Sequence, residues 1–192
     1  VALSLERMRR IVAVDPANRV LVCEPGVLNQ EVQEAARPHG FFWPPDPSSA
    51  AYCSVGGNLA TCAGGPHAVK YGVTRDHVLG LKAVTGKGEI IKTGCYTTKG
   101  VVGYDLTRLL IGSEGTLAIL TEATLKLSPL PADVGGLTAH YRDIASCAAA
   151  IASERSSTSS SAIANCCRKA SKRACGVVCC DLRISGSLAA FV

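Results

Sequence analysis

Two short segments near the start of the chain, residues 10–15 and 19–24, are rich in β-branched residues. A turn-forming Asp-Pro-Ala-Asn sequence separates them, which predicts a β-hairpin. Residues 28–37 follow another pattern, because apolar and small residues recur there every three or four positions until Pro38 interrupts them. That period predicts one amphipathic helix.

Three prolines make the segment 41–54 unsuited to regular structure, because each fixes a backbone angle and removes an amide donor. A shaped loop is therefore expected. Paired glycines then bracket residues 58–62, a stretch long enough for one helical turn. Farther on, residues 78–84 and 89–92 flank a Thr-Gly-Lys-Gly sequence, which predicts a second hairpin.

The following part of the chain mixes helical and strand patterns. Residues 104–111 are compatible with a short helix, and strict alternation over residues 117–127 predicts a half-buried strand. A weaker strand is predicted at residues 137–141 and an Ala-rich helix at residues 143–152. Hairpins and helices without a regular strand–helix–strand rhythm favour an α+β fold.

Composition and charge narrow the function classes. The chain has 192 residues, of which 47% are hydrophobic, and no apolar run is long enough to span a bilayer. The net charge of +5 is uneven, because residues 1–152 contribute +1 and residues 153–192 contribute +4. The first part shows no basic stripe, so the charge does not predict a nucleic-acid partner.

The ten cysteines do not predict a disulfide framework, because the N-terminal residues lack the features of a secretory signal. Half of them lie in residues 166–180, beyond a Ser-rich run at residues 153–161 that is typical of a flexible linker. No C-x-x-C pair or companion histidine accompanies them, so no metal site is predicted. Because composition changes abruptly after residue 152, we hypothesise that residues 153–192 are read out of frame and have no function.

Two glycine-bearing segments are candidates for ligand binding. In residues 45–65 the hydroxyls of Ser54 and Thr61 can donate to phosphate oxygens, and the glycines allow a ligand to approach the backbone closely. The turn at residues 112–116 precedes the long strand. On composition alone, tight turns beside packed helices explain these glycines better than a ligand does. No G-x-G-x-x-G or P-loop sequence occurs, which excludes those two nucleotide sites.

Taken together and in order, several segments resemble one family. They are Pro45-Asp46-Pro47-Ser48-Ser49, residues 53–61, residues 63–65, Lys70-Tyr71-Gly72-Val73-Thr74, Gly112-Ser113-Glu114-Gly115-Thr116-Leu117 and residues 121–127. Over residues 1–152 the chain resembles the FAD-linked subunit of bacterial glycolate oxidase and related D-lactate dehydrogenases. The resemblance implies an α+β, p-cresol methylhydroxylase-type FAD-binding domain, incomplete at both ends. Residues 1–131 would be the partial FAD-binding domain, residues 132–152 the start of a substrate domain, and residues 153–192 an atypical tail.

The resemblance also implies which residues bind FAD. Pro45, Asp46 and Ser54 would lie on a flavin-facing loop. The residues expected at the isoalloxazine or the diphosphate are Gly56, Gly57, Asn58, Thr61, Cys62 and Gly64. The adenine–ribose end or its neighbouring phosphate would meet Glu114, Gly115 and Ile119.

Cys62 departs from the family pattern, because relatives carry Asn in the corresponding Thr-Asn-Ala-Gly-Gly run. A thiol hydrogen-bonds poorly, so the site would lose about 1 kcal/mol of binding. The alternative, slightly favoured, is that Cys62 packs as a small apolar residue.

The implied activity is the oxidation of a 2-hydroxy acid, glycolate or D-lactate, to the 2-oxo acid by hydride transfer to flavin. Electrons would pass to a quinone or a partner subunit, which would place the protein in the cytoplasm or at the inner membrane. No catalytic residue is assigned, because the four histidines are isolated, and the chain alone is expected to be inactive. The alternative is a non-catalytic binding module whose basic tail binds metal or nucleic acid.

Overall fold

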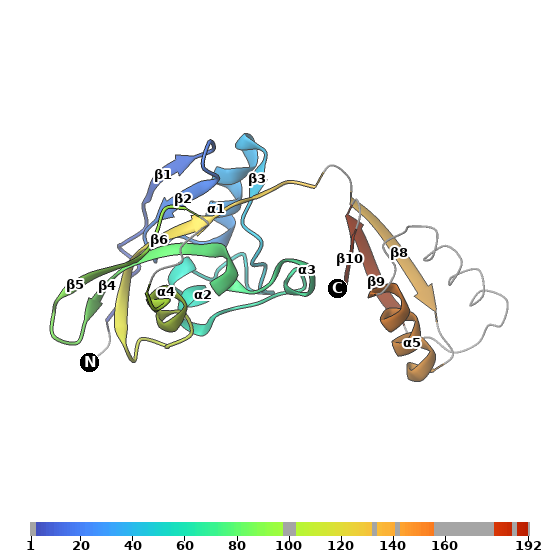
Figure 1. Ribbon diagram of the computed structural model, residues 1–192. Helices are drawn as coiled ribbons and strands as arrows, with labels where there is room; N and C mark the ends of the chain where they lie inside the picture. Colours follow the sequence, from blue (N-terminus) through green and yellow to red (C-terminus); the bar gives the residue numbers. More distant parts are fainter. Residues whose placement is uncertain are drawn as a thin grey trace. The chain divides into compact units, whose positions relative to one another are not determined.

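The structure is a computed structural model that describes residues 3–97, 103–131, 134–140, 143–155, 179–185 and 188–191 (Figure 1). The chain divides into two compact units, Val1–Leu130 and Pro131–Val192, and each is considered by itself. Among the described residues, no helix combines the length and the apolar character needed to cross a membrane.

A five-stranded antiparallel sheet forms the framework of the first unit. Its order is β1-β2-β6-β4-β5. The strands are β1 (Ile11–Asp15), β2 (Val20–Cys23), β4 (Val78–Thr85), β5 (Ile90–Gly94) and β6 (Ala118–Lys126). Both predicted hairpins are confirmed, and the long alternating segment forms the central strand β6, which pairs with β2 and β4.

Short helices and a small ribbon complete this unit. They are α1 (Asn29–Ala36), η1 (Arg37–His39), β3 (Phe41–Phe42), α2 (Val55–Thr61), α3 (Ala68–Tyr71), η2 (Thr74–His77), α4 (Leu106–Leu110) and β7 (Ser128–Pro129). The predicted helix at residues 28–37 is confirmed as α1, and that at residues 104–111 is shorter than expected. The expectation of a wholly irregular segment at residues 41–54 is wrong at its start, because β3 pairs with β7 across a long sequence separation.

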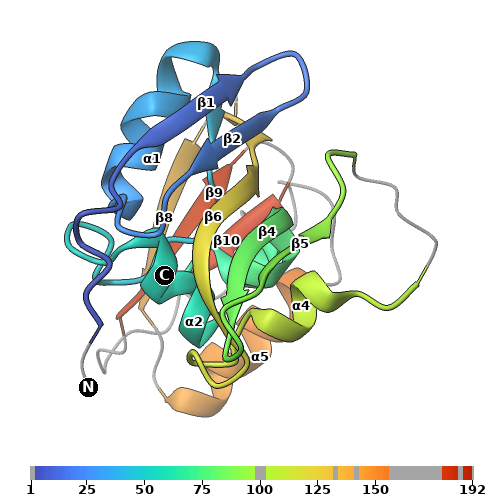
Figure 2. The same ribbon diagram turned by 90° about the vertical axis from the view of Figure 1, so that its left-hand side faces the viewer.

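The core lies between one face of the sheet and these helices. It includes Leu21 and Leu125 from the sheet, Val32 from α1 and Leu59 from α2. Trp43 is fully buried among them, and its Nε1–H donates to the carbonyl oxygen of His77 at 3.2 Å. Figure 2 shows α1 alongside β1, and α4 along the edge formed by β4 and β5.

The second unit contains a three-stranded antiparallel sheet of order β10-β9-β8 and one helix. The elements are β8 (Val134–His140), α5 (Ile144–Arg155), β9 (Cys179–Ser185) and β10 (Leu188–Phe191). The predicted strand at residues 137–141 overlaps β8, and the predicted Ala-rich helix is α5. Most of the cysteine-rich tail, residues 156–178, lies outside the described residues, so the out-of-frame hypothesis stays a prediction.

His77 is a buried titratable group within the first unit, with 7% of its surface exposed. Its Nε2 lies 2.8 Å from the carbonyl oxygen of Tyr71, which can only accept, so the ring proton sits on Nε2. Its Nδ1 is buried without a hydrogen-bond partner among the described residues. Burial, more than any other cause, lowers the pKa of His77 below its ordinary value of 6.5.

We expect this histidine to make stability depend on pH. The unfolded imidazole takes up a proton near pH 6.5, whereas the folded one does so only at lower pH. The free energy of unfolding should therefore fall as pH drops from 6.5 to the folded pKa. Urea unfolding at pH 7.5 and 5.5 measures the difference. His77→Gln should shrink it, the exposed-site control His39→Gln should not, and equal pH dependence in both variants would refute the assignment.

Candidate functional site

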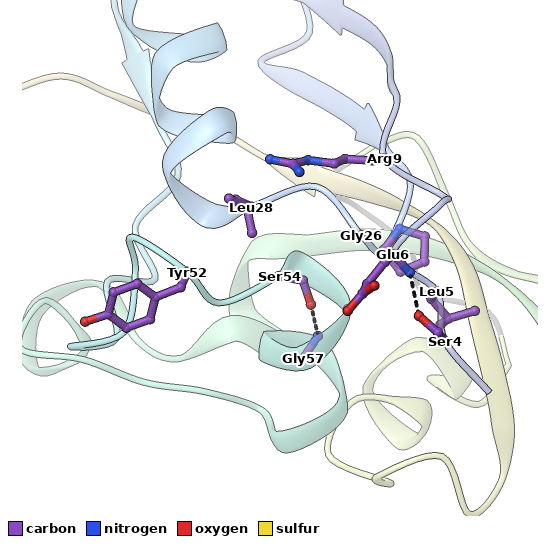
Figure 3. A pocket seen from close by; sticks show the side chains of 11 residues that line it. Ser4, Leu5, Glu6, Arg9, Gly26, Leu28, Tyr52, Ser54 and Gly57 are labelled. Atoms are coloured by element: carbon purple, nitrogen blue, oxygen red, sulfur yellow. Dashed lines mark hydrogen bonds between the residues drawn. The ribbon is translucent and has the colours of Figure 1, made fainter. Parts of the chain in front are cut away.

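Two adjoining cavities lie at the start of α2. The larger, of about 560 Å³, is lined by the N-terminal segment, by Pro25, Gly26 and Leu28, and by Tyr52, Ser54, Gly56 and Gly57 (Figure 3). The smaller, of about 220 Å³, is lined by Leu3, Leu5, Pro25, Gly56, Ala60, Ser113, Gly115, Ala118, Ile119 and Leu120. Leu5, Pro25 and Gly56 line both cavities. We call the two together the α2 groove.

Close backbone approach fixes the first wall of the groove. The Gly56 N–H donates to the carbonyl oxygen of Pro25 at 2.7 Å. A Cβ on Gly56 would lie 2.7 Å from the Cβ of Pro25, closer than real side chains come, so this position requires glycine. The neighbouring Gly57 donates its N–H to the Ser54 hydroxyl at 3.1 Å, which caps α2. The helix therefore begins three residues earlier than the predicted turn at residues 58–62.

The second wall comes from the turn before β6. Gly112 and Glu114 donate their N–H groups to the carbonyl oxygens of Leu59 and Ala60, at 2.9 and 3.0 Å. Glu114 and Gly115 both have positive φ, of 50° and 76°. A Cβ on Gly115 would meet nothing within 4 Å, so this residue faces open space. These bonds hold the turn against α2 and bring the two glycine-bearing segments to one groove.

One acidic and one basic side chain, Glu6 and Arg9, line the groove. Figure 3 shows the Glu6 carboxylate pointing toward the start of α2, whereas Tyr52 extends away from it. Arg9 pairs with Glu31 at 2.7 Å, and its hydrogen bond is the main cause that lowers the pKa of Glu31. Glu31 also accepts from the Leu28 N–H at 2.9 Å, so Arg9 is tied to the start of α1. The positive charge of Arg9 is thus already partly compensated.

The expected site residues divide into two groups. Ser54, Gly56, Gly57, Gly115 and Ile119 line the α2 groove. Those that line neither of its cavities are Pro45, Asp46, Asn58, Thr61, Cys62, Gly64 and Glu114. The Thr61 hydroxyl instead donates to the Gly57 carbonyl at 3.0 Å, which reinforces α2.

Asp46 joins the proline-rich loop to the turn after α2. Its carboxylate accepts from the His67 N–H at 3.0 Å and lies 3.0 Å from His67 Nδ1. A Cβ on Gly65 would overlap the Asp46 carbonyl oxygen, so the two loops meet closely there. His67 is thus a hydrogen-bonded histidine that ties the two loops together. No group of three or more His, Cys, Asp or Glu suited to a metal occurs among the described residues.

Cys62 ends α2 in a left-handed conformation, with φ of 51°. Its Sγ accepts from Arg75 Nε at 3.1 Å, and the side chain packs partly buried against the core. Asn adopts a left-handed backbone conformation more readily than Cys does. The chain therefore departs from the family pattern at a position whose backbone favours the family's Asn. Both earlier interpretations of Cys62 stay open.

Sequence reasoning missed the N-terminal part of the groove. Leu3, Leu5, Glu6 and Arg9 gave no periodic signal among their charged neighbours. Gly26 was the available clue, because its N–H donates to the Met8 carbonyl oxygen at 2.7 Å and a Cβ there would clash with two carbonyl oxygens. That contact holds the N-terminal segment against Gly26, beside the start of α2.

Comparison with known families gives a match over the N-terminal part of the chain. An FAD binding domain family matches residues 1–94. The match covers just under half of the chain. This stretch contains the proline-rich loop, all of α2 and the first wall of the groove.

Relatives extend the likeness beyond residue 94. The chain is 46% identical over 142 residues to glycolate oxidase subunit GlcD of Bacillus subtilis, covering 74% of this chain and 30% of that protein. It is 44% identical over 151 residues to a D-lactate dehydrogenase of Anaerostipes hadrus, covering 79% and 32%. A D-2-hydroxyglutarate dehydrogenase of Stutzerimonas stutzeri is 39% identical over 137 residues, covering 71% and 30%. The chain thus spans about 30% of the length of these relatives.

A solved structure supports the fold. An alkyldihydroxyacetonephosphate synthase superposes with a TM-score of 0.68 at 28% identity, covering 79% of this chain and 27% of that one. The expected α+β FAD-binding fold and the suspected family are confirmed.

The residues present fit FAD. Gly115 leaves open space beside its backbone, and Ser54 brings a hydroxyl to the larger cavity. Asn58 of α2 lines neither cavity, but it is 3% exposed with no partner for its Nδ2 among the described residues. An unpartnered buried donor costs free energy that a ligand acceptor would recover.

Proposed function

We propose that the α2 groove binds FAD in an oxidoreductase that acts on a 2-hydroxy acid. The observation that carries the proposal is that the two glycine-bearing turns meet at one groove. Gly56 lines both of its cavities, and Gly115 lines the smaller one. Neither turn by itself would indicate a dinucleotide-binding site. Their junction provides one elongated site for a ligand with a ring at each end and a diphosphate between them.

The two cavities of the groove differ in the polarity of their lining residues, which supports a different role for each. The smaller cavity is mostly apolar, with Leu3, Ile119 and Leu120, and suits the adenine and ribose. The larger cavity offers the Ser54 hydroxyl, whose oxygen accepts from the Gly57 N–H and whose proton can donate to a phosphate oxygen, and the glycines beside it let a diphosphate come close. The Glu6 carboxylate also lines this cavity and would repel a diphosphate. The hydrogen-bond donors in the cavity must therefore stabilise the diphosphate by more than this repulsion costs.

The remaining expected residues belong to loops adjoining α2. We infer that Pro45, Asp46, Asn58, Thr61, Cys62 and Gly64 approach the isoalloxazine ring, and that Glu114 supports the turn at the adenine–ribose end. Asp46 acts by holding its loop to residues 63–67 through His67. These residues would position the ring, whereas FAD itself supplies the capacity to accept a hydride.

The substrate is proposed from the relatives' names, which include a glycolate oxidase subunit and D-lactate dehydrogenases. The reaction would convert glycolate or D-lactate to the 2-oxo acid, and electrons would leave to a quinone or a partner subunit. We assign no catalytic residue within this chain. A cytoplasmic location, or attachment to the inner membrane through partner subunits, belongs to the same proposal.

Ile119→Asp tests the groove directly. This residue lines the smaller cavity and is 39% exposed, so a carboxylate there should be tolerated by the fold but disfavour FAD. We expect FAD to bind at least about tenfold more weakly, since desolvating a charge beside the ligand costs more than 1 kcal/mol. Quenching of flavin fluorescence on titration with protein measures the affinity.

Ile90→Asp is the matched control, because Ile90 is an exposed β-strand residue that does not line the groove. It should bind FAD like the unaltered chain. Equal losses in both variants would remove the support for this site, and absence of any quenching by the unaltered chain would contradict the proposal that the groove holds FAD.

A further inference from the structure

A second groove lies along the β5 edge of the sheet and shares no lining residue with the α2 groove. Its volume of about 770 Å³ is within the range of small-molecule sites. Its lining comes mainly from β4, β5 and the segment around α4, with Arg75, Asp76 and Lys126 in addition, and Figure 2 shows α4 beside β4 and β5. We call it the β5 groove.

Six of its sixteen lining residues are charged. The cations are Arg75, Lys92, Arg108 and Lys126, and the anions are Asp76 and Asp105. Arg108 holds both carboxylates, with Nη2 2.9 Å from Asp76 and Nε 3.5 Å from Asp105. The two anions are therefore already engaged, and the lining has a net charge of +2.

The other three cations come from separate elements, Arg75 from η2, Lys92 from β5 and Lys126 from β6. Among the described residues, Arg75, Lys92 and Lys126 have no carboxylate within ion-pair distance. Arg75 donates from Nε to the sulfur of Cys62 at 3.1 Å. Lys126 is half-buried, and its charge adds to the effect of burial in lowering the pKa of His77. The Cys62 sulfur and then Asp76 raise the pKa of Arg75, so its charge is partly compensated. Lys92 and Lys126 have no ion-pair partner among the described residues, so an anion in the groove would be attracted to them.

The groove also offers neutral contacts for an organic molecule. Val78, Leu79 and Leu106 contribute apolar surface, and the Thr93 and Thr107 hydroxyls lie beside it, bonded to each other at 2.9 Å. We propose that the β5 groove binds a small organic polyanion, whose carboxylate or phosphate groups pair with Lys92 and Lys126 while Arg75 adds positive potential. The FAD assignment does not enter this proposal, because the two grooves have separate linings.

Calorimetric titration of the full chain with citrate and with inorganic pyrophosphate, at constant ionic strength, tests the proposal. We expect saturable binding of at least one probe at one site per chain. Citrate alone would indicate carboxylates as the ligand groups and pyrophosphate alone would indicate phosphates. The double variant Lys92→Ala, Lys126→Ala should weaken binding at least about tenfold, because it removes two charge-assisted contacts.

Two further double variants test whether the loss of binding is specific to the lysines that line the groove. Lys82→Ala with Lys87→Ala removes the same charge from the β4–β5 hairpin, yet neither residue lines the groove, so binding should stay within about twofold. Lys92→Arg with Lys126→Arg retains the charge and should retain binding, which separates loss of the site from loss of the fold. No saturable binding of either probe, or equal weakening in the two alanine double variants, would overturn the proposal. FAD titration of the same variants tests the α2 groove separately.

Discussion

Trp43→Ala should lower the free energy of unfolding by about 3–5 kcal/mol, the largest effect expected for a single substitution in the first unit. Trp43 is fully buried in the core. Its Nε1–H bonds the His77 carbonyl, and its backbone exchanges hydrogen bonds with the Gln33 side chain. The substitution leaves a large cavity and an unsatisfied carbonyl oxygen. Urea unfolding followed by circular dichroism measures the loss.

Trp43→Phe is the matched control, because it fills most of the volume but cannot donate to the His77 carbonyl. The expected loss is about 1–3 kcal/mol. An unfolding midpoint for Trp43→Ala equal to that of the unaltered chain would mean that Trp43 does not hold the proline-rich loop against the core.

Gly56→Ala should weaken FAD binding at least about tenfold and lower stability by about 1–3 kcal/mol. The added Cβ would come within 2.7 Å of the Pro25 Cβ and 2.9 Å of the Pro25 carbonyl oxygen, so α2 and Pro25 must separate. Both residues line both cavities of the α2 groove. One displacement would therefore disturb the whole proposed FAD site, as a flavin fluorescence titration would detect.

Gly86→Ala provides the comparison for this variant. Its Cβ would meet nothing within 4 Å, and Gly86 is not among the glycines with positive φ. We expect FAD affinity like that of the unaltered chain. If Gly56→Ala also bound FAD normally, the groove between Pro25 and α2 could not be where the cofactor sits.

The sequence predicted the sheet better than the helices, for physical reasons. β6 was recognisable because its buried residues recur at every second position, at Ala118 and Leu120 and again at Ala123 and Leu125, with one irregularity between the two pairs. The start of α2 was missed because Gly56 and Gly57 have poor helix propensity, and here the Ser54 cap and the bond to Pro25 override it. β3 was missed because its partner lies nearly ninety residues away.

The site was predicted only in part. The glycines were found from the order of the motifs, whereas the N-terminal wall depends on the long-range contact between Gly26 and Met8, which no local pattern reports. Asp46 and Asn58 were expected near the cofactor, but Asp46 bonds His67, and Asn58 lines neither cavity and has no partner for its Nδ2 among the described residues. Their proposed roles concern the flavin ring and stay predictions.

Hydrogen exchange measured with and without FAD tests most directly whether the two glycine-bearing turns grip one ligand. Amides of residues 56–58 and of residues 113–116 should both exchange more slowly in the presence of FAD, while those of the β4–β5 turn should not change. Protection confined to one of the two turns, or to neither, would contradict a shared FAD site in the α2 groove.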